Sequence, residues 1–174
     1  CLDSSNNVFV LGSTTGALTG SNTSEEDLFI IKYNNSGAQQ WIKQYGDNDN
    51  MFRGTSIAID YLDNIYITGF TYNGSDYDII LRKLNQDGTI NWQNIITSSG
   101  SANDYSYGIK TDKLGFIYIT GYTSGSLLTS PLNSFVGDDM FIAKYNTNGV
   151  KKWIRQFGSS FNDQIVLSSS IEVD

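Results

Sequence analysis

The chain contains no histidine, one cysteine and one proline among its 174 residues. Without histidine it cannot form a Ser-His-Asp or Cys-His catalytic group, a histidine haem ligand or most zinc and copper sites. A single cysteine excludes an internal disulfide. Basic residues number only 11 against 18 acidic ones. The net charge of −7 argues against nucleic-acid binding, which needs clustered lysine and arginine. No run of about 18 apolar residues is present, so no transmembrane helix is predicted.

The residues that are abundant favour strands and loops. Phe, Trp and Tyr make up 13% of the chain, and there are 17 glycines. Aromatic and β-branched residues suit strands, whereas good helix formers such as Ala, Leu and Glu are scarce. No segment shows sustained helical periodicity. The composition therefore predicts an all-β protein.

Two motifs recur three times along the chain, which indicates internal repeats. The first is an alternating apolar segment with a glycine at its sixth position, found at 7–14, 64–71 and 116–123. The second starts at an aspartate, reads Asp-x-x-Ile/Leu-x-Lys-Tyr/Leu, and occupies 27–33, 78–84 and 139–145. A tryptophan follows each of these aspartates at a constant spacing of 14 residues: Trp41, Trp92 and Trp153.

Each repeat is predicted to hold four short antiparallel strands. In the second repeat these are about 55–60, 65–71, 78–84 and 91–97, and we refer to such strands as A, B, C and D. The A–B turns contain Asp3, Asp60 and Asp112, whose carboxylates can accept hydrogen bonds from turn N–H groups. The C–D turns begin with asparagine and contain a glycine that suits a left-handed conformation. Four-stranded units repeated every 50–60 residues are typical of β-propeller blades.

The repeat resembles the bacterial SBBP β-propeller repeat. The resemblance rests on Ile-Tyr-Ile-Thr-Gly-Tyr/Phe-Thr, followed by Asp-x-Phe-Ile-x-Lys-Tyr-Asn and then tryptophan, and it covers essentially the whole chain. It implies a secreted or surface-anchored bacterial protein, often a lipoprotein, with no assigned activity. The segment 29–41 is also similar, more weakly, to the tryptophan-docking repeat of quinoprotein propellers. That similarity implies that the tryptophans lie on outer strands and pack on the neighbouring blade.

We expect one propeller segment over 1–174. Blade 1 spans about 1–54 and lacks most of its inner strand, blade 2 about 55–105 and blade 3 about 106–167, with a spare inner strand at 168–174. Three blades cannot close a ring. The chain is then either an arc of a longer propeller, the favoured interpretation, or a subunit that completes blade 1 of a second copy by strand donation.

Cys1 allows two interpretations. It could be the lipidated first residue of a mature lipoprotein. However, it aligns with Ala58 inside a strand, so we expect a small buried apolar residue instead.

One oxygen-rich segment is a candidate Ca²⁺ site: Asp47, Asn48 and Asp49. It lacks the glycine and the final acidic residue of an EF-hand loop. We therefore favour a polar turn and expect no metal and no cofactor.

The D–A loops each combine an aromatic ring with Asp and Asn side chains, a combination suited to sugar binding. The candidate ligand-face residues are Phe52, Asp104, Tyr105, Phe161 and Asp163. Because the combination recurs along the sequence in all three repeats, the alternative is structural: the ring closes the blade end and the carboxylate caps a turn. The acidic residues Glu25, Glu26 and Asp138 do not recur, and we expect them to be solvated.

These features predict a non-catalytic, extracellular or bacterial cell-surface propeller that binds a protein or glycan through its B–C and D–A loops. One alternative is a self-assembling filament or sheath subunit that uses 168–174 as a donated strand. Another is a propeller enzyme of the quinoprotein or glycosidase type. The enzyme is disfavoured because no residue constellation breaks the repetition, and we expect no catalytic residues.

Overall fold

The computed structural model describes residues 1–20, 26–46, 51–128, 137–158 and 171–173. Within these residues the chain forms eleven strands in three antiparallel sheets, with no helix. The first sheet contains three strands, β1 (Val8–Thr14), β2 (Asp27–Tyr33) and β3 (Gln39–Tyr45). The second contains β4 (Phe52–Ile59), β5 (Ile65–Tyr72), β6 (Tyr77–Leu84) and β7 (Ile90–Ile96). The third contains β8 (Asp104–Thr111), β9 (Ile117–Thr123), β10 (Asp139–Tyr145) and β11 (Lys151–Phe157).

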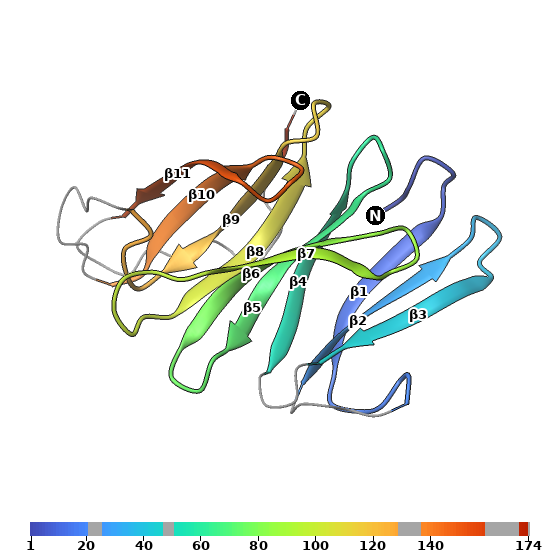
Figure 1. Cartoon of the computed structure of the whole chain (residues 1–174), viewed down its shortest axis with the longest axis horizontal. Coiled ribbons are helices and arrows are strands. Elements are labelled where there is room, and N and C mark those ends of the chain that lie inside the picture. Colours follow the sequence, from blue (N-terminus) through green and yellow to red (C-terminus); the bar gives the residue numbers. More distant parts are fainter. Residues whose placement is uncertain (21–25, 47–50, 129–136, 159–170, 174) are drawn as a thin grey trace.

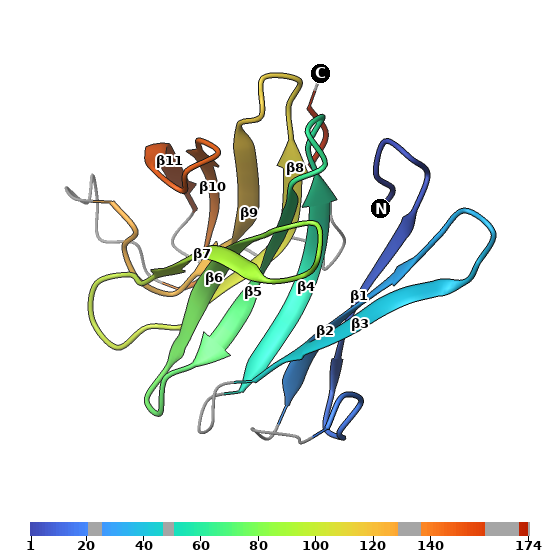
Figure 2. The same cartoon turned by 45° about the vertical axis from the view of Figure 1, so that its right-hand side comes forward.

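The second and third sheets are four-stranded meanders, ordered β4-β5-β6-β7 and β8-β9-β10-β11. The three sheets lie side by side in the order of the sequence (Figure 1). The rotated view shows that neighbouring sheets pack face to face (Figure 2). The expected all-β class and four-stranded blades are therefore confirmed. In the first sheet, the Cys1 carbonyl accepts a hydrogen bond from the Phe9 N–H at 2.9 Å, as a residue near the end of an inner strand would.

Apolar side chains fill the two spaces between the sheets. The space between the first and second sheets holds a buried cluster that includes Phe9, Ile30, Ile65 and Ile80. The other holds the larger cluster, lined by Tyr66, Ile79, Leu81, Ile119 and Phe141 among others. Alternation along each strand sends successive side chains to opposite faces, so the second sheet supplies apolar residues to both spaces.

The turn chemistry follows the sequence prediction. Asp60 Oδ1 accepts hydrogen bonds from the N–H groups of Leu62 and Asn64, both at 2.9 Å. Asp3 and Asp112 accept the equivalent bonds in their own A–B turns. At the C–D turns, the glycine adopts a positive φ of 76–82° in all three blades. These turns lie at the same end of every blade (Figure 1).

The tryptophans lie on the outer strands, as the resemblance implies. Trp92 on β7 packs against the cluster between the second and third sheets, and its Nε1–H donates to the Thr147 carbonyl of the third blade at 3.0 Å. Trp41 lies on β3 and contacts Phe9 with an edge-to-face geometry.

Two details correct the sequence prediction. Cys1 is exposed, not buried. The inner strands begin three and two residues earlier than expected, at Phe52 and Asp104. Residues 168–170 and 174 lie outside the described residues, so the spare inner strand stays a prediction.

Candidate functional site

The described parts of the B–C and D–A loops lie at the end of the blades opposite the Asp turns (Figure 1). Phe52 and Asp104 begin the inner strands that start at this end. Phe52 is buried, with the Arg82 guanidinium 4.4 Å from its ring centroid. Asp104 is fully buried, whereas Tyr105 is partly exposed. Phe161, Asp163 and the candidate Ca²⁺ ligands Asp47, Asn48 and Asp49 lie outside the described residues.

Strand register shows that Tyr105 is not the counterpart of Phe52. Phe52 pairs with Thr71, and Asp104 pairs with the equivalent Thr123. Phe52 and Asp104 therefore occupy the same position in their blades, and Tyr105 corresponds to Arg53. A shift of one residue in a strand moves a side chain to the other face of the sheet. The aromatic ring is thus not a repeated feature of the D–A loops, which the sequence comparison had implied.

Asp104 has a structural role at this position. Its carboxylate accepts hydrogen bonds from the Ser98 N–H at 2.6 Å and from the Thr123 hydroxyl. Burial raises the pKa of Asp104 to about 6, an effect that these hydrogen bonds only partly offset. This turn-capping arrangement is the structural alternative considered for the D–A loops.

A cluster of aromatic side chains surrounds Tyr105 at the junction of the second and third blades. We define the tyrosine cluster as the buried Phe70 together with five partly exposed tyrosines: Tyr72, Tyr77, Tyr105, Tyr107 and Tyr122. Phe70 packs edge-on against Tyr105, with ring centroids 4.8 Å apart. Tyr105 lies 5.3 Å from Tyr77 and 5.0 Å from Tyr122. One continuous set of contacting rings therefore joins strands of two blades.

The equivalent junction between the first and second blades uses different chemistry. The counterparts of Tyr77 and Tyr105 are Glu26 and Arg53, which form an ion pair of 2.7 Å between Arg53 Nη2 and Glu26 Oε2. Arg53 Nε also donates to the same carboxylate. Glu26 is therefore paired, not solvated as expected. Since an ion pair holds one junction, the blade packing itself does not require tyrosines at the other.

Burial and neighbouring groups keep Tyr105 and Tyr122 protonated. The pKa of Tyr105 is raised to about 12, chiefly by burial and then by Tyr77, Tyr107 and Asp138. Burial also raises the pKa of Tyr122, as does its hydrogen bond with Tyr107. Tyr105 and Tyr122 therefore offer neutral rings and neutral hydroxyl groups at physiological pH.

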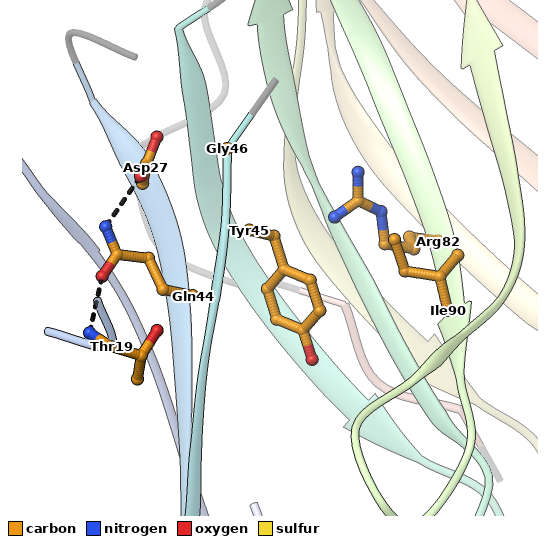
Figure 3. Close-up of a pocket in the computed structure, with 7 residues that line it drawn as sticks. All are labelled: Thr19, Asp27, Gln44, Tyr45, Gly46, Arg82 and Ile90. Atoms are coloured by element: carbon orange, nitrogen blue, oxygen red, sulfur yellow. Dashed lines mark hydrogen bonds between the residues drawn. The ribbon is translucent and has the colours of Figure 1, made fainter. Parts of the chain in front are cut away.

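A second feature that breaks the repetition lies between the first and second sheets (Figure 3). Arg82 stands where the other blades have Ile31 and Ala143. It borders an open pocket of about 260 Å³ lined by Thr19, Asp27, Gln44, Tyr45, Gly46, Arg82 and Ile90. The guanidinium lies against the Phe52 ring and donates to Gln93 Oε1 from Nε at 3.0 Å. Both partners belong to the second sheet, whereas the Tyr45 ring, 5.5 Å from the Arg82 guanidinium carbon, belongs to the first sheet. We therefore assign Arg82 a packing role.

The acidic residues that begin the C strands are also structural. Asp27 accepts a hydrogen bond from Gln44 at 2.7 Å, and Asp139 accepts one from Gln156 at 3.0 Å. The second blade has Ile95 at the glutamine position, and there Asp78 accepts from Asn73 instead. Within the described residues, no group of three or more Cys, Asp or Glu side chains is arranged to hold a metal ion. Ca²⁺ binding at 47–49 stays a prediction.

The sheets, their meander order and their face-to-face packing define the chain as a series of β-propeller blades. Residues 40–78 and 96–129 match the SBBP beta-propeller repeat family. These two segments are SBBP repeats, as the sequence motifs predict. Each match begins near the outer strand of one blade and extends into the inner strands of the next, so it includes the D–A loop.

The chain is also similar to an uncharacterised WD repeat-containing protein of Acanthamoeba polyphaga mimivirus. The two are 29% identical over 171 residues, which cover 79% of this chain. The chain spans only 12% of the length of that relative. Among the described residues, no helix is long and apolar enough to cross a membrane.

Proposed function

We propose that this chain is a non-catalytic binding and scaffolding segment of an extracellular β-propeller. Its ligand, a protein or a glycan, would bind at the end formed by the B–C and D–A loops. The SBBP repeats and the similarity to a WD repeat-containing protein support an interaction role. The extracellular location rests on the SBBP resemblance.

The tyrosine cluster is the observation that carries this proposal. Residues needed by every blade recur in every blade, as Asp60 and its counterparts do. Tyr77 and Tyr105 do not recur, and the ion pair at the other junction shows that packing can be achieved without them. Partly exposed aromatic side chains gathered at one loop end are typical of binding surfaces, because they give contact area at a small entropic cost.

At the opposite end of the blades, Tyr61, Leu62 and Leu114 are exposed on the A–B turns, but the described residues there form no group of contacting rings like the tyrosine cluster. The A–B and C–D turns at this end are closed by their own Asp and Asn side chains, which use their carboxylate and amide oxygens within the turn. These turns have constant geometry, whereas the loops at the other end vary in length between blades. Variable loops on a fixed scaffold are where recognition is usually placed.

An array of purified extracellular proteins and glycans tests the proposal. The decisive variant replaces Tyr77 with Glu and Tyr105 with Arg, because this copies the ion pair of the first junction and should preserve the fold. The control is Tyr61→Ala, which removes an exposed ring from the opposite end. We expect at least one ligand that binds the wild type and the control but not the double variant. This ligand should be recovered chemically unchanged.

Two results would contradict the proposal. One is chemical conversion of the bound ligand, which would indicate an enzyme. The other is a ligand set that is unaffected by the double variant or depends on Tyr61 instead, which would place recognition at the other end.

Self-assembly is a second candidate function, and exposed sheet faces favour it. Val8 and Val10 on the open face of the first blade are 37% and 41% exposed, while their counterparts Ile65 and Ile67 are buried against a neighbouring sheet. On the open face of the third blade, Tyr118 and Ile142 are partly exposed, whereas Tyr66 and Leu81 are fully buried. These faces suit a further blade, from this protein or from a second copy.

A further inference from the structure

We infer that the tyrosine cluster binds a neutral carbohydrate chain. This inference rests on the proposed binding function and specifies its ligand. It follows from the spacing of the rings, from the charges around them and from the polar groups at their edge.

The ring spacing favours stacking on top of the cluster over insertion between its rings. The Tyr105 and Tyr107 planes differ by 22° with centroids 6.3 Å apart, and those of Tyr107 and Tyr122 differ by 22° at 5.8 Å. A prolyl ring held between two aromatic rings would need them about 7–8 Å apart, since each contact takes about 3.5–4.0 Å. The spacing therefore disfavours the slots that proline-rich peptides use. Near-parallel, offset rings instead form a platform for the C–H faces of sugar rings.

The balance of charge around the cluster disfavours anionic sugars. The negative charges of Asp138 and Asp104 both raise the pKa of Tyr105, so acidic groups lie close to the rings. The basic group at the edge, Arg53, is engaged by Glu26 through both Nε and Nη2. The chain carries a net charge of −7. A sulfated or uronic-acid polymer would be repelled, whereas a neutral chain would not.

Polar groups at the edge of the cluster match sugar hydroxyls. The tyrosine hydroxyls can donate and accept hydrogen bonds. The raised pKa values of Tyr105 and Tyr122 keep the donor proton of these two hydroxyls in place. Asn103 is exposed, and its Oδ1 accepts a hydrogen bond from the Tyr77 N–H at 3.1 Å. That bond fixes the side chain beside the rings, so its amide is oriented before any ligand arrives.

Isothermal titration with neutral hexasaccharides tests the inference, with cellohexaose, maltohexaose and chitohexaose as the probes. We expect at least one to bind the chain and to bind at least about tenfold more weakly to the Tyr77→Glu/Tyr105→Arg variant. Tyr105→Phe keeps the ring and should bind within about threefold of the wild type. Tyr61→Ala should bind as the wild type does. Thermal melting checks that each variant is folded, and Tyr107→Thr, which copies Thr55 of the preceding blade, replaces the double variant if that one unfolds.

The outcomes separate this inference from the proposed function. If no neutral hexasaccharide binds but a protein or an anionic glycan binds through the tyrosine cluster, the carbohydrate assignment is overturned and the binding function stands. Hexasaccharide binding that is equal in the wild type and the double variant also overturns the assignment. If no array ligand depends on the cluster, both fail together.

Discussion

Single polar side chains fix the backbone at both ends of each blade. Asp60 shows this most fully: it accepts from two turn N–H groups, from the Asn64 amide and from the Tyr66 hydroxyl at 3.1 Å. At the opposite end, Asp104 joins the D–A loop to strand β9 through Ser98 and Thr123. Burial raises the pKa of Asp104 to about 6.

Asp104 should make the stability of the chain depend on pH. Its folded pKa of about 6 lies above the unfolded value near 3.9, so the folded state binds this proton more tightly. Its contribution to the free energy of unfolding is therefore present below pH 4 and is lost as the pH rises through 6. Asp104→Asn removes the charge while keeping an acceptor for Ser98 and a donor for Thr123.

We expect Asp104→Asn to be more stable than the wild type at pH 7.5, with the difference shrinking towards pH 5. Urea unfolding at several pH values measures this. Asp87→Asn, an exposed change in a C–D turn, is the control. A stability difference that stays constant between pH 5 and 7.5 would show that the carboxyl is not titrating as described.

Sequence patterns predict the turn residues because each acts on N–H groups only two to four residues away. The partners of Asp27 and Asp139 could not be predicted in this way. Gln44 and Gln156 each lie 17 residues further along the chain, and only strand pairing brings them together. The replacement of this glutamine by Ile95 in the second blade also hides the pattern.

At the scale of the strands, each complete blade has a close approach between its first two strands. Irregularities in register occur at Gly54/Ser56 and at Ser106/Gly108, opposite Gly69 and Gly121. A Cβ on Gly69 would overlap the Arg53 carbonyl oxygen, and one on Gly121 would overlap that of Tyr105. Backbone atoms cannot move aside as a flexible side chain can.

We expect Gly69→Ala and Gly121→Ala each to lower the free energy of unfolding by about 2–3 kcal/mol, because the strands must separate to admit the methyl group. Gly16→Ala is the matched control, since its nearest neighbour is 3.8 Å from the added atom. Urea unfolding of the three variants gives the comparison. Equal losses at Gly16 and Gly121 would contradict the steric explanation.

The strands could be predicted well because they are short, aromatic and bounded by turn residues. Their starts at Phe52 and Asp104 were placed late, because the D–A loops carry polar residues that resemble loop sequence. With the strand starts misplaced, the tyrosine cluster could not be predicted from the sequence. Only the observed register shows that Tyr105 corresponds to Arg53, and hence that the two junctions differ.

At the scale of the whole molecule, the blades form an arc with two unlike ends. Every blade has one face that can pack against the preceding blade and one that can pack against the following blade. In the first blade the face towards a preceding blade is open, whereas in the third blade the face towards a following blade is open. The two ends are therefore complementary in kind, as heterologous association requires.

Light scattering tests whether this complementarity drives self-association. For a self-assembling subunit we expect a mass that rises above 19.3 kDa with concentration. Val10→Lys should reduce that mass towards the monomer, because it places a charge in the contact. Val150→Lys, at an exposed turn position, should not. A wild-type mass of 19.3 kDa at all concentrations would contradict self-assembly and favour a segment completed by further blades of its own chain.

The difference between the two junctions has a consequence for how the repeats find their order. Near-identical sheets can pair wrongly while a repeat protein folds. Packing the third blade directly onto the first would place Tyr105 beside Glu26, leaving a carboxylate against an aromatic ring without its guanidinium partner. The correct order instead satisfies both junctions at once. The Glu26–Arg53 and Tyr77–Tyr105 contacts thus specify which blade packs after which.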